Sequence, residues 1–470
     1  MTRFGMALLA LVFAGVAGAH VGSPDVFFQG KAGPWPLLVT IRPPDVIPGV
    51  ARIEIRSLSP GVKQIQLTPT PMTGEASKHP PVADIATVSR DDPKSFDGSL
   101  WLMGMGSWVV HIHASGDAGE GDLLVPVPAL ATKIAPMGSG MGYFLMGMMV
   151  FLVVGMVAIV GAAVRESRLD PGLPAARWTP KTLGAMAFAA ALLILILWGG
   201  NAWWAGDAEA FRQRIYKPLA ITATVDARGH GDFRLNDPGW VSLRKLDDLI
   251  PDHGHLMHLF LIRMPAMERV YHLHPDQAAT GFFSINLPSL PAGSYKLFAD
   301  LVHDNGLDET AVGEAQLPEI HGTPLSGDDA GGAPESDGET TRLADGYTMV
   351  WLKGEAGVVK AKQATHFAFE IKTPGGAPAE DLEPYMGMGG HAEFVKRDGT
   401  VFAHVHPSGS VSMASVSVAS PAGMLAMHER RVGPAVSFPF GVPSAGQYRI
   451  FVQMKRAGKV ETGAFDLDVK

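Results

Sequence analysis

The chain of 470 residues contains no cysteine. This excludes disulfide scaffolds, zinc ribbons, iron–sulfur clusters, thiol catalysis and the His2Cys blue-copper centre, because each needs a cysteine sulfur. Charge is also scarce, since charged residues make up 18% of the chain and the net charge is −8. A chain without excess positive charge has little attraction for phosphate backbones, so nucleic-acid binding is not expected. Any metal must therefore be held by carboxylates, the backbone, or the 17 histidines and 22 methionines.

The first 19 residues predict a signal peptide. Arg3 precedes an apolar run over residues 7–16, and Ala17-Gly18-Ala19 forms a small-residue cleavage site. Cleavage there leaves His20 as the first residue of the exported protein. The alternatives are cleavage elsewhere or retention of the segment as an anchor.

Two further apolar runs, residues 141–164 and 182–204, are long enough to cross about 30 Å of hydrocarbon as helices. The loop between them, residues 165–181, carries four basic residues: Arg165, Arg168, Arg177 and Lys181. A short basic loop favours the cytoplasm, and the tryptophans at the outer end of the second run favour the opposite interface. Together with the signal peptide, this predicts a multi-pass protein of the bacterial inner membrane with its N- and C-terminal domains in the periplasm.

The exported segments are rich in short, alternating, β-branched or aromatic stretches separated by glycine and proline. This pattern predicts a mainly β fold with three antiparallel β-sandwich domains of cupredoxin or immunoglobulin type. We place them at residues 20–135, 215–320 and 347–470, with the two-helix transmembrane hairpin between the first and the second. Residues 321–346 are rich in Gly, Ser, Asp and Thr, which predicts a flexible linker.

The second and third predicted domains contain an internal repeat. Residues 249–258 align with 382–391, residues 271–275 align with 403–407, and both copies end in a Gly-x-Tyr strand. The aligned histidines are His258 with His391, His272 with His404, and His274 with His406. Because alternate side chains of a strand share one face, each His-x-His pair can approach one ion.

The two copies differ in an informative way. His253 and His255 of the first copy correspond to Met386 and Met388 of the second. Copper accepts both imidazole and thioether ligands, and the thioether favours Cu(I). The pattern therefore predicts a His-rich copper site in the first copy and a Met-rich Cu(I) site in the second. The alternative is that the histidines are ordinary surface residues and the methionines fill the core.

One further histidine of the first copy, His303, aligns with Arg456 of the second. His303 could add a ligand in the first copy, but the arginine at the aligned position of the second copy is not a metal ligand. We expect His303 to be a surface residue.

The first domain carries its own His-x-His pair. His111 and His113 lie on the face of a predicted strand opposite Trp108, Val110 and Ile112. With His20 at a free N-terminus, the α-amine and imidazole of that residue could chelate copper. His111 or His113 would complete such a histidine brace.

Two resemblances follow from these motifs. The Pro-x-Met-Gly-Met-Gly-Gly-His stretch at 384–391, with His404 and His406, resembles the YtkA-like and CopC-like β-sandwich modules of bacterial copper handling. The order of parts, with His20, His111 and His113, resembles the B subunit of particulate methane and ammonia monooxygenases. The linkers and the duplicated His/Met domain depart from that subunit.

The sequence thus predicts a membrane-anchored periplasmic copper-binding protein for copper acquisition, delivery or tolerance. It would exchange Cu(I) or Cu(II) with other inner-membrane or periplasmic copper proteins and is not expected to be an enzyme. One alternative is the copper subunit of a monooxygenase-like membrane complex that uses the histidine brace. Another is a scaffolding membrane protein without metal.

Overall fold

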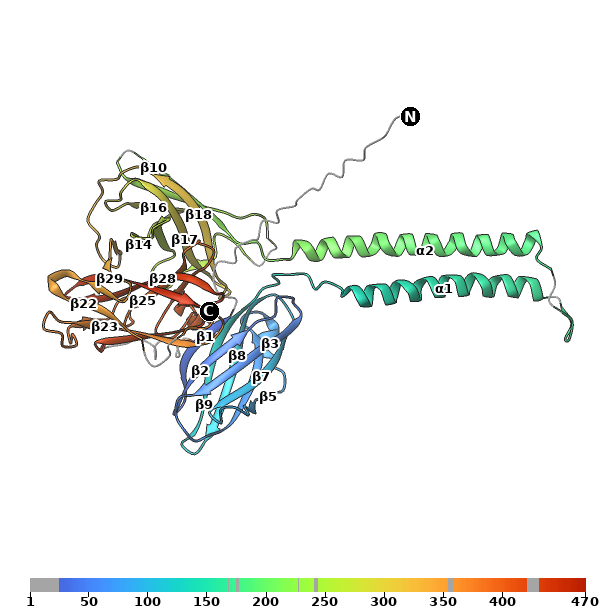
Figure 1. The fold of residues 1–470 in the computed structure, drawn as a ribbon, viewed down its shortest axis with the longest axis horizontal. Coiled ribbons are helices and arrows are strands. Elements are labelled where there is room, and N and C mark those ends of the chain that lie inside the picture. The colour runs from blue at the N-terminus through green and yellow to red at the C-terminus, as the bar shows by residue number, and fades with distance from the viewer. Residues whose placement is uncertain are drawn as a thin grey trace, which may run out of the picture. The chain divides into compact units, whose positions relative to one another are not determined.

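The computed structural model describes residues 25–167, 169–174, 177–226, 228–240, 244–353, 358–420 and 431–470. Leu130–Tyr216 form one compact unit, and the β-rich segments on either side of it in the sequence form the other. The prediction of a mainly β protein with two helices between its first and second β regions is confirmed (Figure 1). The predicted signal peptide and His20 lie outside the described residues.

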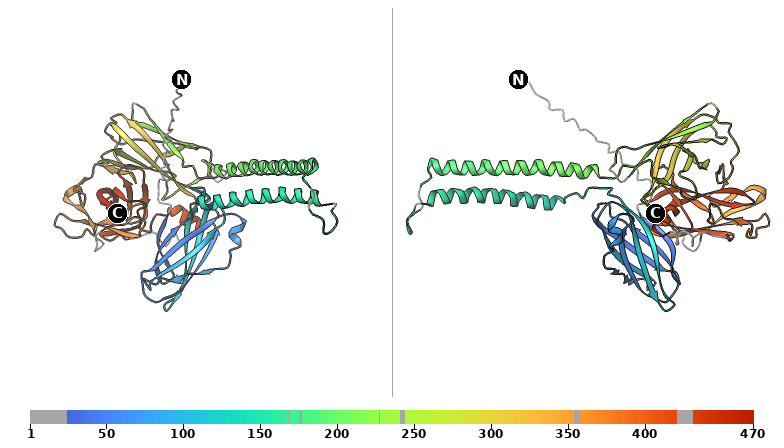
Figure 2. Two further views of the ribbon diagram at one scale, coloured as in Figure 1. Left: turned by 45° about the vertical axis from the view of Figure 1, so that its right-hand side comes forward. Right: turned by 180° about the vertical axis from the view of Figure 1, so that it is seen from behind.

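The two helices are α1 (Ser139–Glu166) and α2 (Pro180–Gln213), and both are long and apolar enough to cross a membrane. They enclose the two predicted spans and run side by side (Figure 2). Gly161 of α1 permits their close approach, because a Cβ atom there would lie 2.6 Å from the sulfur of Met186 in α2. Very little of their apolar surface is buried, as expected of helices surrounded by lipid.

The N-terminal β region consists of two antiparallel sheets. One has the order β1-β2-β3-β7-β6 and the other the order β5-β4-β8-β9. The first contains β1 (Val26–Ala32), β2 (Trp35–Arg42), β3 (Gly49–Ser57), β6 (Thr87–Val88) and β7 (Ser95–Leu102). The second contains β4 (Val62–Pro71), β5 (Asp84–Ile85), β8 (Gly106–Gly116) and β9 (Gly119–Ala129). In β3, buried and exposed residues alternate, which is typical of a strand with one face in the core.

The first repeat forms a sheet of order β15-β16-β11-β10-β18-β17-β13-β14-β19, with β12 paired to β17. All of its strand pairs are antiparallel except β10 with β18. Its strands are β10 (Ala220–Val225), β11 (His230–Asn236), β12 (Leu249–Ile250), β13 (His258–Met264), β14 (Val270–Leu273), β15 (Asp276–Ala279), β16 (Phe282–Asn286), β17 (Gly293–His303), β18 (Asp308–Leu317) and β19 (Ala330–Gly332).

The second repeat forms two sheets, β20-β21-β22-β23-β27 and β24-β28-β25-β26, with β29 paired to β28. The first contains β20 (Glu335–Ser336), β21 (Thr340–Arg342), β22 (Thr348–Leu352), β23 (Thr365–Lys372) and β27 (Ala435–Phe440). The second contains β24 (Leu382–Glu383), β25 (His391–Lys396), β26 (Phe402–Val405), β28 (Gly446–Arg456) and β29 (Lys459–Val469). A short helix, α3 (Met413–Ala419), follows β26.

The sequence repeat is also a structural repeat, because the central strands have the same register. His258 lies opposite Asp300 in the first copy, as His391 lies opposite Gln453 in the second. The turns before these strands match as well: residues 252 and 255 form an isolated bridge, as do residues 385 and 388. His253 and Met386 have φ values of 51° and 49°, and each is followed by a glycine with positive φ. Glycine adopts this left-handed region without strain.

The two repeats share an apolar interface. Phe260 and Phe298 of the first copy are buried in one cluster with Phe402 and Phe451 of the second. The rings of Phe298 and Phe402 stack with centroids 4.2 Å apart. Side chains on these faces of β13 and β25 are therefore enclosed between the repeats.

Residues 321–346 differ from the expected flexible linker, because they contain β19, β20 and β21. Strand β19 pairs with β14 and so extends the sheet of the first repeat. Composition favours a loop here, but pairing with an existing sheet edge supplies hydrogen bonds that composition does not reveal.

The expectation that His303 is a surface residue is wrong. Its side chain is buried, with Nδ1 2.6 Å from Asp248 and Nε2 3.0 Å from Glu309. Arg456, its counterpart, is also buried, and it forms ion pairs with Asp381 and Glu461. The aligned positions therefore share a buried basic side chain with carboxylates beside it, as burial of such a group requires.

Candidate metal centre

Eight predicted ligands gather at one place between the two repeats. Each imidazole has another imidazole centroid within 5.1 Å. The eight residues are His253, His255, His258, His272, His274, His391, His404 and His406. The structure therefore brings together every histidine that the sequence predicted as a ligand in the two repeats.

Three of these residues, His258, His272 and His274, form a group that could hold a metal ion, which we call site A. One ring nitrogen from each lies within 4.8 Å of the other two. His258 Nδ1 and His272 Nε2 are 3.0 Å apart. His274 Nε2 is buried and has no hydrogen-bond partner among the described residues.

The other ring nitrogens of site A are held by oxygen acceptors. The pairs are His258 Nε2 with the carbonyl of Asp252 at 3.1 Å, His272 Nδ1 with Oε1 of Gln453 at 2.9 Å, and His274 Nδ1 with Oδ1 of Asp329 at 3.0 Å. Each acceptor holds the proton of a neutral imidazole on the outer nitrogen. The inner nitrogens then face one another with lone pairs, which is the arrangement of a metal-binding triad with its outer hydrogen bonds in place.

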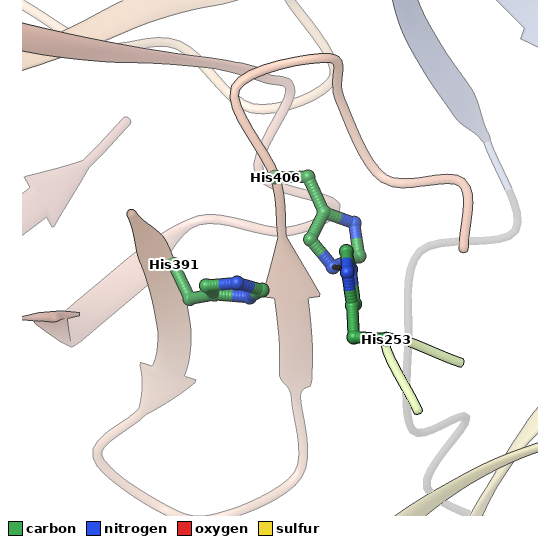
Figure 3. A group of neighbouring side chains, drawn as sticks. All are labelled: His253, His391 and His406. Atoms are coloured by element: carbon green, nitrogen blue, oxygen red, sulfur yellow. Dashed lines mark hydrogen bonds between the residues drawn. The ribbon is translucent and has the colours of Figure 1, made fainter. Parts of the chain in front are cut away.

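A second group, which we call site B, consists of His253, His391 and His406 (Figure 3). His391 begins β25, His406 follows β26, and His253 comes from the turn of the other repeat. The Nε2 atoms of His253 and His406 are 3.4 Å apart. His391 Nε2 is buried and has no hydrogen-bond partner within the described part of the chain. Site B therefore draws on both repeats.

Outer contacts also orient site B. His406 Nδ1 donates to the carbonyl of Val411 at 3.2 Å. His391 Nδ1 lies 2.9 Å from His404 Nε2, and His404 Nδ1 lies 3.2 Å from a carboxylate oxygen of Asp300. His404 thus supports His391 from outside the triad.

Burial favours the uncharged form of six of these imidazoles. It lowers the pKa of His258 to about 4 and that of His406 to about 3. The pKa values of His272, His274, His391 and His404 also fall well below the usual range, first by burial and then by repulsion from neighbouring histidines. A neutral imidazole has a free lone pair, so these residues need not lose a proton before they bind metal at neutral pH.

His255 lies beside site A rather than within its triad. Its ring stacks on that of His274 with centroids 4.0 Å apart, and its Nε2 lies 3.3 Å from a carboxylate oxygen of Asp328. Met388, its counterpart in the second copy, is buried, and Met386 is partly buried. Ligation by either methionine stays a prediction at this point.

Several residues beside the site were not predicted from the sequence. Five contact its imidazoles, and they are Asp252, Asp300, Asp328, Asp329 and Gln453. The sixth, Glu393, lies opposite His404 on the neighbouring strand. Asp300 and Gln453 had a usable signal, because they stand at equivalent positions of the two Gly-x-Tyr strands.

Glu393 is the least expected of these residues. It is fully buried opposite His404, and its carboxylate oxygens have no hydrogen-bond partner among the residues described. Burial, and secondarily the charge of Asp300, raises the pKa of Glu393 well above its usual range. Both effects favour the neutral carboxylic acid over the carboxylate.

The predicted ligands of the N-terminal domain do not join either triad. His111 Nε2 lies 2.9 Å from the hydroxyl of Thr70, and His113 Nδ1 lies 2.8 Å from Asp122. Among the described residues, the groups of imidazoles and carboxylates that could hold a metal are sites A and B. Since His20 lies outside those residues, the histidine brace stays a prediction.

Comparison with known proteins leaves the function open. A family described as a domain of unknown function, DUF8832, matches residues 341–470, which include His391, His404 and His406. No curated protein matches.

Several solved structures are similar to parts of the chain. A tetra-tandem repeat of a large adhesion protein is 12% identical, with 90% of this chain and 72% of that chain covered and a TM-score of 0.17. The fibronectin(III)-like modules of Clostridium thermocellum CbhA are 10% identical, with 53% and 94% covered and a TM-score of 0.15. Salmonella alpha-2-macroglobulin is 11% identical, with 97% and 24% covered and a TM-score of 0.20. Likenesses at this level do not bear on the site.

Proposed function

We propose that the chain is a membrane-anchored, exported copper-binding protein that acts in copper acquisition, delivery or tolerance. The observation that carries this proposal is the pair of buried imidazole triads between the repeats. In each triad, one buried ring nitrogen, His274 Nε2 or His391 Nε2, has no hydrogen-bond partner among the described residues, while a neighbouring side chain contacts the other nitrogen of that ring. Copper is the cargo in this proposal, and the sites are where it is held.

The energetics favour a metal in these triads. A buried polar atom without a hydrogen bond costs about 1–3 kcal/mol. His274 Nε2 and His391 Nε2 are two such atoms, one in each triad. At site A, the two nitrogens 3.0 Å apart also face each other with lone pairs when their outer nitrogens carry the protons. A cation coordinated by these nitrogens removes both costs.

The donor set favours copper among the metals that imidazole binds. Zinc, copper, iron and nickel all accept imidazole, but a thioether is a soft ligand that selects Cu(I). In this chain, Met386 and Met388 replace histidines at equivalent turn positions, and Tyr385 of the same turn lies next to His391 and His272 of the imidazole cluster. The predicted signal peptide and basic loop support an exported position for both repeats. In an oxidising compartment cysteine would form disulfides, whereas methionine does not and can still bind Cu(I).

The test is the metal content of the full chain, purified in detergent and loaded anaerobically with Cu(I). We expect two copper equivalents to be retained against a competing chelator, and zinc to be displaced. The variant with His258→Ala and His391→Ala should retain none. His230→Ala, on the surface of β11, is the matched control and should retain two. Failure of the parent protein to retain copper, or preferential retention of zinc, would overturn the proposal.

A further inference from the structure

The two repeats contact each other through the same pair of positions in both directions. His272 of the first repeat lies 2.9 Å from Gln453 of the second, and His404 of the second lies 3.2 Å from Asp300 of the first. His272 corresponds to His404 and Asp300 to Gln453 in strand register. The repeats are therefore related by an approximate two-fold axis, as are the subunits of an isologous dimer.

The turn of the first repeat crosses this axis. His253 reaches His391 and His406 of the second repeat and completes site B. Its neighbour Asp252 accepts a hydrogen bond of 2.7 Å from the backbone N–H of Ala414, also in the second repeat. His253, although it belongs to the first repeat, therefore lies with the candidate ligands of the second repeat.

The equivalent turn of the second repeat crosses in the other direction. Tyr385, the counterpart of Asp252, donates its hydroxyl to the carbonyl of Asp328 at 2.6 Å. Its ring centroid is 5.0 Å from that of His391 in its own repeat and 6.4 Å from that of His272 in site A. Asp328 and the adjacent Asp329 are the carboxylates that contact His255 and His274. The turn over residues 385–388 therefore ends beside site A.

From this reciprocal crossing we infer that the thioether of Met386 is the fourth ligand of a metal ion at site A. Met386 has the same backbone conformation as His253 and stands at the same position of the crossing turn. The approximate two-fold axis relates Met386 to His253. Met386 should therefore stand beside site A in the way that His253 stands beside site B. This inference rests on the proposed function and adds a ligand that the grouping of imidazoles alone does not contain.

The inference reverses the expected roles of the two repeats. The methionine-bearing turn completes the site whose three imidazoles come from the first repeat. Site A then has three imidazoles and one thioether and favours Cu(I), whereas the crossing ligand of site B is an imidazole that serves either oxidation state. The protein thus holds two copper sites of different preference, and each depends on both repeats.

The experiment uses the full chain with His253→Ala and His406→Ala, which removes site B and leaves one copper equivalent at site A. Copper X-ray absorption should show one sulfur neighbour beside nitrogen neighbours. Adding Met386→Leu should remove the sulfur and weaken Cu(I) binding by at least roughly tenfold, since loss of outer-shell partners alone typically costs that much. Met386→His should restore affinity without sulfur and shift the preference toward Cu(II).

The control is Met413→Leu, a buried methionine of α3 beside the residue that contacts Asp252, which should keep the sulfur signal. If copper binds but Met386→Leu changes neither the sulfur signal nor the affinity, the assignment is overturned while the proposed function stands. The assignment would also be overturned if Met388→Leu, rather than Met386→Leu, removed the sulfur neighbour from the copper X-ray absorption spectrum. If the site-B-deficient parent binds no copper, the proposed function fails at site A.

Discussion

Replacing His253 by alanine should weaken copper binding at site B and leave site A intact. His253 is the ligand that the first repeat supplies to site B, and its Nε2 faces that of His406 at 3.4 Å. The variant keeps both imidazoles of the second repeat, so a two-ligand remnant persists. We expect copper retained against a chelator to fall from two equivalents to one.

The energetic effect can be estimated from linkage. A ligand at a free concentration 1,000 times its dissociation constant stabilises the folded state by about 4.1 kcal/mol. If loss of one imidazole weakens binding roughly 10–100-fold, the copper-dependent stabilisation from site B falls by about 1.4–2.7 kcal/mol. Urea unfolding of the parent and the variant, each with and without Cu(I), measures this difference and separates it from any change in the metal-free protein.

The matched control is again His230→Ala, which should leave both the stoichiometry and the copper-dependent stabilisation unchanged. The reasoning would be refuted if His253→Ala retained two equivalents with full stabilisation, because the ligand from the opposite repeat would then be irrelevant. Loss of both equivalents at once would equally contradict two separable sites.

Three further outcomes test the surroundings of the sites. Asp329→Asn removes the carboxylate that holds His274 Nδ1 and should weaken copper binding at site A roughly 10–100-fold in a chelator competition, with site B unaffected. Burial lowers the pKa of His303, but hydrogen bonds to two carboxylates outweigh it and raise the pKa above 6.5. Its stabilisation is therefore complete below the unfolded pKa and lost as pH rises through the folded value, so His303→Gln should flatten the pH dependence of urea unfolding across that range. Phe298→Ala removes the ring stacked on Phe402 and should lower the free energy of unfolding by about 3–5 kcal/mol, and an unchanged unfolding midpoint would contradict the shared core.

Much of the architecture follows from local sequence patterns. Alternation in the exported segments and the two long apolar runs suffice for the β-rich regions and for α1 and α2, because strand and helix periodicity are short-range properties. The repeat alignment likewise anticipates equal register, as in the pairs formed by His258 and His391.

Burial by distant partners was not predictable in the same way. His303 aligned with an arginine, which favoured the surface, yet the carboxylates of Asp248, just before β12, and Glu309, in β18, contact it. Residues 321–346 have the composition of a linker, yet β19 pairs with a sheet edge and Asp329 orients a candidate ligand. Asp248 and Asp329 each lie 55 residues from the histidine that they contact, so a short sequence window does not include the pair.

The sequence by itself determined which side chains are available as ligands. It also determined how residues close together in the chain are oriented relative to one another. A His-x-His pair shares one strand face, and a glycine after residue 253 or 386 permits the turn, because both effects act over a few residues. Only the tertiary structure decided which ligands meet. The sequence suggested one site within each repeat, whereas packing of two sheets through an approximate two-fold interface sends His253 across to His391 and His406. That grouping depends on contacts between segments more than a hundred residues apart, and no local pattern encodes it.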